Sequence, residues 1–260
     1  MKKIKLQKGE VEIFDLGAIK LHAYQTNDPM NDEVLILQKG SEVVIIESPD
    51  FYENNIELEN YLKELGVVSK GVLIAYHPTG ATFLKNVKRY STKEAENFAN
   101  GASKIMVDNF SKAFGDAYDN HVNSITNYIK TPKLEIAGIK LNILKTAEAF
   151  DVEIPEINAV YTHMLGGDTH SIIEGAEAGK KMIKVLETFQ KKRFNLILSS
   201  HHTPENQKAV SSKIAYLNDV LKIAQQSNSA FEMKNKVKEI YPNYKGEPYL
   251  EMSVNFFFKK

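Results

Sequence analysis

The stretch GVLIAYHPTGAT, residues 71–82, contains the feature that decides the fold. Residues 71–76 form a continuous apolar run, and its length and branched side chains are typical of a strand covered on both faces. This run leads directly into His77. A side chain that can bind a metal therefore stands at the end of a predicted buried strand.

A hairpin and a helix are predicted before this strand. Residues 34–37 and 43–46 are apolar runs joined by a short turn that contains Gly40, which is the pattern of a β-hairpin. Further along, apolar residues recur at positions i, i+3, i+4 and i+7 counted from Leu58. This spacing predicts one apolar face of a helix between the hairpin and the buried strand.

A second block of strands and further helices follow. The predicted strands cover residues 134–136, 139–144, 152–154, 159–161 and 195–198, and the predicted helices cover residues 171–191, 206–226 and 231–241. Residues 252–258 fit either a last strand or an apolar tail. Because neither half alternates strands and helices regularly, the order favours an α+β fold with two packed sheets and helices outside. We expect one domain over residues 1–260, with residues 206–260 as a C-terminal helical extension that ends in one of these two alternatives.

Composition excludes several classes of function. The 33 basic residues equal the 33 acidic residues, so no basic excess indicates nucleic-acid binding. Cysteine is absent, which excludes disulfides and thiolate metal sites. No apolar run reaches the length of a signal peptide or a membrane helix. We expect a cytoplasmic protein without membrane partners; a secreted chain lacking its signal would look the same.

The order of these features resembles the metallo-β-lactamase superfamily, which implies a four-layer αββα sandwich of two mixed sheets and a bacterial hydrolase. The signature of that family, His-x-His-x-Asp-His, begins at the end of the buried strand. In this sequence only His77 matches it. Thr79 and Thr82 stand at the other histidine positions, and Ala81 stands at the aspartate position.

The resemblance continues through most of residues 10–205. Residues 147–150 lie where the third histidine motif of the family falls, and they contain no histidine. Residues 158–163 resemble the strand before the bridging aspartate of the family, but the next aspartate is Asp168. Residues 198–201 resemble the last strand of the family, with His201 as its terminal histidine. His77 and His201 belong to different metals in that pattern, so ordinary two-zinc hydrolysis is not expected.

A substitute metal site is predicted from a polar cluster beside Gly166 and Gly167. His163, Asp168 and His170 follow one another closely there, and two glycines give the backbone freedom to approach a ligand. One metal ion, Zn2+ or another divalent cation, would find enough ligands among the residues His77, His163, Asp168, His170 and His201. Asp168 is also the predicted catalytic residue.

A purely structural interpretation stays open beside this one, with no metal bound at all. His77 and His201 then hydrogen-bond to the backbone of a former active site, and Asp168 caps a helix that begins near Ser171. His22 and His121 lie away from every motif and are expected to be core or surface residues.

Two functions therefore compete. The first is a hydrolase-like protein with a rebuilt, single-metal site that acts on an unknown small molecule. The second is a non-catalytic member of the fold that binds a small molecule or a partner protein in the former cleft. The sequence has no Gly-x-Ser-x-Gly elbow and no phosphate-binding loop. The apolar tail at residues 254–258 is a candidate contact in a homo-oligomer.

Overall fold

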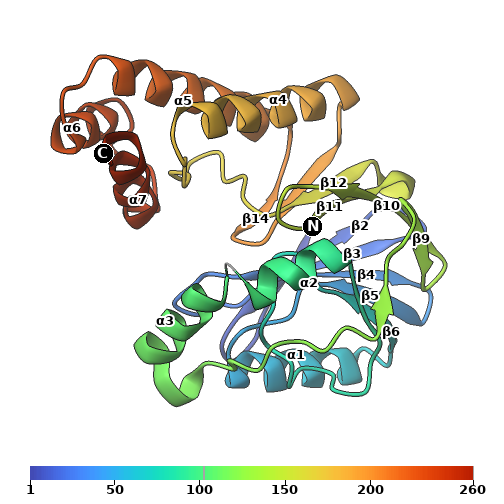
Figure 1. The fold of residues 1–260 in the computed structure, drawn as a ribbon. Coiled ribbons are helices and arrows are strands. Elements are labelled where there is room, and N and C mark those ends of the chain that lie inside the picture. Colours follow the sequence, from blue (N-terminus) through green and yellow to red (C-terminus); the bar gives the residue numbers. More distant parts are fainter. Residues whose placement is uncertain (102, 260) are drawn as a thin grey trace. The chain divides into compact units, whose positions relative to one another are not determined.

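The computed structural model describes residues 1–101 and 103–259, which divide into two compact units. The first unit comprises Met1–His163 and Leu198–Pro204, and we refer to it as the sandwich unit. The second unit comprises Met164–Ile197 and the chain from Glu205 onward, and we refer to it as the helical unit. Figure 1 shows the course of the chain through both.

The sandwich unit contains an eight-stranded sheet with its strands in sequence order. Its strands are β1 (Lys2–Lys5), β2 (Glu10–Asp15), β3 (Lys20–Gln25), β4 (Glu33–Lys39), β5 (Glu42–Ile46), β6 (Val68–Leu73), β7 (Arg89–Ser91) and β8 (Asn127–Tyr128). Neighbours from β1 to β5 are antiparallel, and neighbours from β5 to β8 are parallel. The change follows from the connections: a short turn joins β4 to β5, whereas helix α1 (Tyr52–Glu64) carries the chain from β5 back to β6.

Both faces of this sheet are buried. Val34 and Ile36 of β4 belong to a core cluster with Leu58 of α1, and the alternate residues Leu35 and Leu37 are also fully buried. Because successive side chains of a strand point to opposite faces, a second layer must cover the face away from α1.

The second sheet has six strands in the order β14-β13-β12-β11-β10-β9. Its strands are β9 (Lys133–Ile136), β10 (Ile139–Lys145), β11 (Phe150–Ile154), β12 (Ala159–Thr162), β13 (Leu196–Ser199) and β14 (His202–Glu205). Neighbours from β9 to β12 are antiparallel. The predicted α+β fold with two sheets is therefore confirmed, although β6 ends three residues before the predicted end at residue 76.

The remaining helices lie in both units. The sandwich unit also holds α2 (Lys93–Asn100), α3 (Lys104–Phe114) and the short 3-10 turns Gly115–Ala117 and Pro155–Ile157, and the helical unit holds α4 (Ala176–Lys192), α5 (Gln207–Gln225), α6 (Ala230–Ile240) and α7 (Glu247–Phe258). Residues 252–258, expected to form either a last strand or an apolar tail, form neither of these, because they are the end of α7. Leu250, Ser253 and Val254 are buried at i, i+3 and i+4, so the apolar run follows a helical period.

Residues 164–197 belong to the helical unit together with the chain from Glu205 onward, and the expectation of one domain stays a prediction. Among the described residues, no helix is both long enough and apolar enough to cross a membrane.

Candidate metal centre

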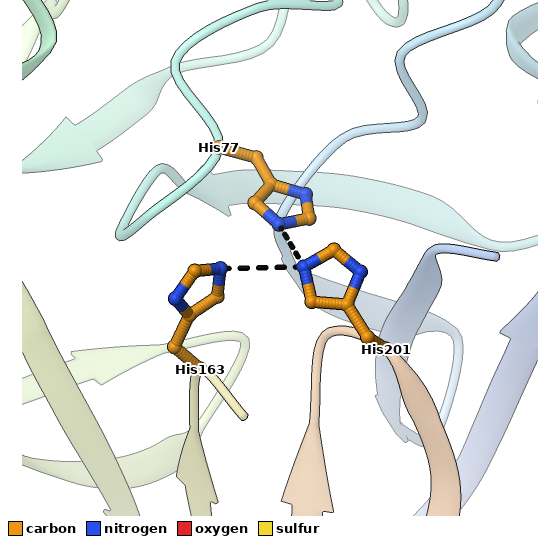
Figure 2. A group of neighbouring side chains, drawn as sticks. All are labelled: His77, His163 and His201. Atoms are coloured by element: carbon orange, nitrogen blue, oxygen red, sulfur yellow. Dashed lines mark hydrogen bonds between the residues drawn. The ribbon is translucent and has the colours of Figure 1, made fainter. Parts of the chain in front are cut away.

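Three histidines follow the ends of three strands of the sandwich unit. His77 lies four residues beyond β6, His163 directly follows β12, and His201 lies in the turn between β13 and β14. Figure 2 shows that their rings converge although the residues are far apart in the sequence. The Nε2 atom of His201 lies 3.2 Å from Nε2 of His77 and 3.3 Å from Nε2 of His163.

These distances fit a shared metal ion. Tetrahedral ligands at 2.0–2.1 Å from a metal lie about 3.3 Å from one another. Two of the Nε2 pairs, both of which include His201, already have that spacing. One nitrogen from each of His77, His163 and His201 lies within 4.8 Å of the others.

The protonation of the histidines also suits metal binding. Burial lowers the pKa of His77 well below its usual value, lowers the pKa of His163 to about 3, and lowers the pKa of His201. The neighbouring histidines lower the pKa of His77 further. Neutral imidazole keeps a lone pair on one nitrogen, which is the form that binds a metal.

Two buried carboxyl groups lie beside the histidines. Asp32 Oδ1 lies 3.1 Å from Nδ1 of His201 and 4.0 Å from Nδ1 of His77, and Asp50 Oδ2 also lies 4.0 Å from Nδ1 of His77. Neither side-chain oxygen of Asp32 has a hydrogen bond. Burial raises the pKa of both carboxyl groups well above the usual range. A bound cation would offset the cost of burying their negative charge, so the donor set fits a metal.

Glu47 joins the segments that carry the histidines. It has a left-handed backbone with φ of 66°, and its carboxylate accepts hydrogen bonds from the backbone N–H of residues 75–77, the one at Tyr76 being 2.8 Å long. The Tyr161 hydroxyl donates to Glu47 at 2.6 Å and lies 2.6 Å from the Ser200 hydroxyl. Burial raises the pKa of Glu47 to about 7. One carboxyl group thus connects the loop of His77 with Tyr161, which lies two residues before His163, and through Tyr161 with Ser200, which precedes His201.

The two threonines that stand where the motif of the resembled family has histidines have other partners. The Thr79 hydroxyl donates to Asp50 at 2.6 Å, and the Thr82 hydroxyl donates to the buried carboxylate of Asp119. Both threonines therefore hold carboxylates where the family motif has imidazole ligands.

His163 is held by stacking. Its ring lies parallel to the Tyr76 ring, with centroids 4.6 Å apart and planes 5° apart. The Tyr76 hydroxyl donates to the buried Asp151 at 2.9 Å, which holds the tyrosine in place.

Asp168 and His170 belong to the helical unit, and neither is among the described groups of metal-type ligands. Asp168 has a half-exposed side chain that pairs with Lys245 at 3.3 Å. His170 is buried, its Nδ1 lies 3.0 Å from the Tyr216 hydroxyl, and burial lowers its pKa to about 4. These contacts lend no support to the prediction that Asp168 and His170 bind metal.

The purely structural interpretation of Asp168, His22 and His121 can also be compared with the structure. The helix expected near Ser171 begins at Ala176 with Gly175 as its cap, so Asp168 does not cap it. His22 is a core residue whose two ring nitrogens contact Tyr61 and Gln38, and the ring of His121 is exposed.

Sequence reasoning missed Asp32, Asp50 and Glu47. A signal exists for Asp32 and Glu47: acidic residues directly precede the apolar run of β4 and directly follow that of β5. Asp50 lies further along the chain and has no such signal. Acidic residues at the ends of buried strands enter the interior, where carboxylates need a partner.

Comparison with solved structures identifies the class of fold. A metallo-beta-lactamase family protein from Thermus thermophilus matches 92% of this chain and 91% of its own, at 13% identity and a TM-score of 0.65. A metallo-beta-lactamase from Pontibacter korlensis matches 80% of this chain and 99% of its own, at 15% identity and a TM-score of 0.58.

A stereoselective inverting sec-alkylsulfatase from Pseudomonas sp. matches 96% of this chain at 12% identity and a TM-score of 0.65. The chain spans about half the length of the alkylsulfatases it matches, 50% in each case. No protein-family model and no curated protein matches the sequence. The chain has the metallo-β-lactamase fold, which confirms the resemblance at the level of the fold.

Proposed function

We propose that this protein is a metal-dependent hydrolase of small molecules, with one divalent metal ion bound by His77, His163 and His201. The spacing of the three Nε2 atoms, at 3.2 and 3.3 Å, is the observation that carries the proposal. Three histidine ligands with one open position are a set found in catalytic zinc sites.

A divalent metal in such a site, when bound, supplies Lewis acidity for the hydrolysis of a carbonyl, sulfuryl or phosphoryl bond. The residues of this chain supply its setting. With a metal bound, neutral rings of His77, His163 and His201 would direct their Nε2 lone pairs to it. Asp32 places a carboxyl group beside His201 and His77. Glu47 keeps the loop of His77 in position through three backbone hydrogen bonds.

The solved structures suggest which substrates to try first. They include metallo-beta-lactamases and sec-alkylsulfatases. Secondary alkyl sulfates and lactams are therefore the first candidates, followed by carboxylic esters and phosphodiesters.

Metal content tests the proposal. Protein purified without chelator is measured by elemental mass spectrometry, and the variant His77→Ala/His201→Ala is measured beside it. We expect about one equivalent of zinc, iron or manganese in the wild type and almost none in the variant, because two of three ligands are gone.

The matched control is the variant His121→Ala/His202→Ala, which also loses two histidines, one of them next to His201. Neither residue belongs to a group of metal-type ligands among the described residues. This control should keep the full metal content. Equal loss in both variants would indicate nonspecific binding.

The loss of family ligands at Thr79, Ala81 and Thr82 favours the non-catalytic alternative. A wild-type protein that takes up no metal after incubation with zinc would contradict the hydrolase proposal. It would then support a scaffold that binds a small molecule or a partner protein.

A further inference from the structure

Each candidate histidine ligand has a second ring nitrogen, and the partner of that nitrogen decides which tautomer is present. A proton on Nδ1 leaves the lone pair on Nε2 for the metal. The Nε2 atoms of the three histidines face one another, so the partners of Nδ1 are the groups to identify.

Asp32 lies on the Nδ1 side of His201, at 3.1 Å. The backbone holds it there, because the N–H of Glu33 donates to the carbonyl of Ser200 at 2.6 Å. The residue after Asp32 is thus hydrogen-bonded to the residue before His201. The Asp32 carbonyl also accepts hydrogen bonds from the backbone and the hydroxyl of Thr26, each 3.0 Å long.

The Asp32 side chain makes no hydrogen bond within the described residues. It is fully buried. A buried carboxylate without a partner is costly, so one aimed at two histidines requires an explanation.

We propose that Asp32 is a positioning residue that accepts a hydrogen bond from the Nδ1–H group of His201. Together with Asp50, it also flanks Nδ1 of His77. This arrangement directs the Nε2 lone pairs toward a common point. The inference rests on the proposed function in one respect, namely that the common point is occupied by a metal ion.

The competing assignment is that Asp32, Asp50 and His77 are themselves ligands of a second metal, since their ligand atoms also lie within 4.8 Å of one another. The spacing favours the positioning role. His77 Nδ1 lies 4.0 Å from each carboxylate, whereas the Nε2 atoms are 3.2 and 3.3 Å apart. Asp32 Oδ1 lies 3.1 Å from Nδ1 of His201, which is within reach of a hydrogen bond, although neither atom has a hydrogen-bond partner among the described residues.

Two readouts on the variants Asp32→Ala and Asp32→Asn test the proposal. Nitrogen-15 NMR of the metal-free protein shows which ring nitrogen of each histidine carries the proton. Titration with zinc against a competing chelator gives the stoichiometry and the Kd. The matched control is Asp28→Asn, which removes a carboxylate from the same loop, where it accepts a hydrogen bond from the Met30 N–H at 2.8 Å.

We expect His201 to be protonated on Nδ1 in the wild type and in the control, and to lose this preference in Asp32→Ala. Zinc should still bind at one equivalent, with a Kd about 10–100-fold weaker in Asp32→Ala, the usual effect of removing such a partner. Asp32→Asn should lose less affinity, because the amide oxygen still accepts a hydrogen bond.

Three results would overturn the inference. They are a proton on Nε2 of His201 in the wild type, an unchanged Kd in Asp32→Ala, and a fall from two zinc equivalents to one, which would make Asp32 a ligand. A wild type that binds no zinc at all would instead contradict the proposed function, and the NMR measurement would still decide the role of Asp32.

Discussion

The two units differ in whether all their buried polar side chains have hydrogen-bond partners. The described side chains with buried atoms that lack a hydrogen bond all lie in the sandwich unit, and they are Asp28, Asp32, Glu33, Asn55, Ser199 and His201. The buried polar side chains of the helical unit, in contrast, have partners. Lys213 donates to Ser171 at 3.0 Å and to the Thr169 carbonyl, and the Ser253 hydroxyl donates to the Ser171 carbonyl at 2.7 Å.

This difference separates a structural network from a candidate site. Hydrogen-bonded polar groups make a segment rigid, and in the helical unit they tie residues 169–173 to α5 and α7. Buried groups without partners are costly in a native protein unless a ligand or an ion completes them. Chemistry is therefore to be sought among Asp32 and the three histidines of the sandwich unit.

The largest expected effect is the stabilisation of the protein by zinc, with the gain in protection confined to the sandwich unit. At a free zinc concentration 1,000 times the Kd, binding should stabilise the native protein by about 4 kcal/mol. The amides that gain protection from hydrogen exchange should be those near His77, His163 and His201, because these residues hold the ion. Hydrogen exchange followed by mass spectrometry measures this protection. Protection gained mainly around His170 would contradict the assignment of the metal site to the sandwich unit.

The next effect is expected from Lys213, which is buried in the helical unit, and it concerns the pH dependence of stability. Burial lowers its pKa to about 7 from an ordinary value near 10.5. The unfolded chain therefore binds one more proton than the folded chain between these values, so the stability contribution is fully present above pH 10.5 and is lost as the pH falls to 7. Lys213→Met should remove a slope of at most about 1.4 kcal/mol per pH unit.

Urea unfolding at several pH values between 7 and 10 measures that slope through the difference between wild type and variant. Lys222→Met is the control, because Lys222 is exposed on the same helix. Equal slopes in wild type and Lys213→Met would mean that Lys213 titrates as an exposed lysine does.

The smallest effect is expected from Asp168, which the sequence predicted as a metal ligand and as the catalytic residue. Asp168→Asn should cost about 0.5 kcal/mol or less, because the ion pair with Lys245 is exposed to solvent. We expect the metal content and any hydrolytic turnover to be unchanged. Loss of a metal equivalent in this variant would show that Asp168 is a ligand. It would contradict the assignment of the metal site to the sandwich unit alone.

Local pattern accounts for much of the fold. The apolar runs of β4, β5 and β6 predicted strands, because a continuous apolar run is visible in a short window of sequence. The order of the strand and helix blocks then predicted two sheets. The run at residues 252–258 was misassigned because a short apolar run fits both a strand and a helix, and packing within the helical unit decides between them.

The sequence by itself determined that His77, His163 and His201 follow predicted strands, since each stands next to an apolar run. Only the tertiary structure decided which polar groups join them. Asp32 and His201 are brought together by pairing across 169 residues of chain, and no local pattern records that contact. Asp168 and His170 are close to His163 in sequence, yet they belong to the other unit and have their own partners there. Proximity along a chain does not measure proximity in space, because a strand or a turn carries neighbouring residues into different packing environments.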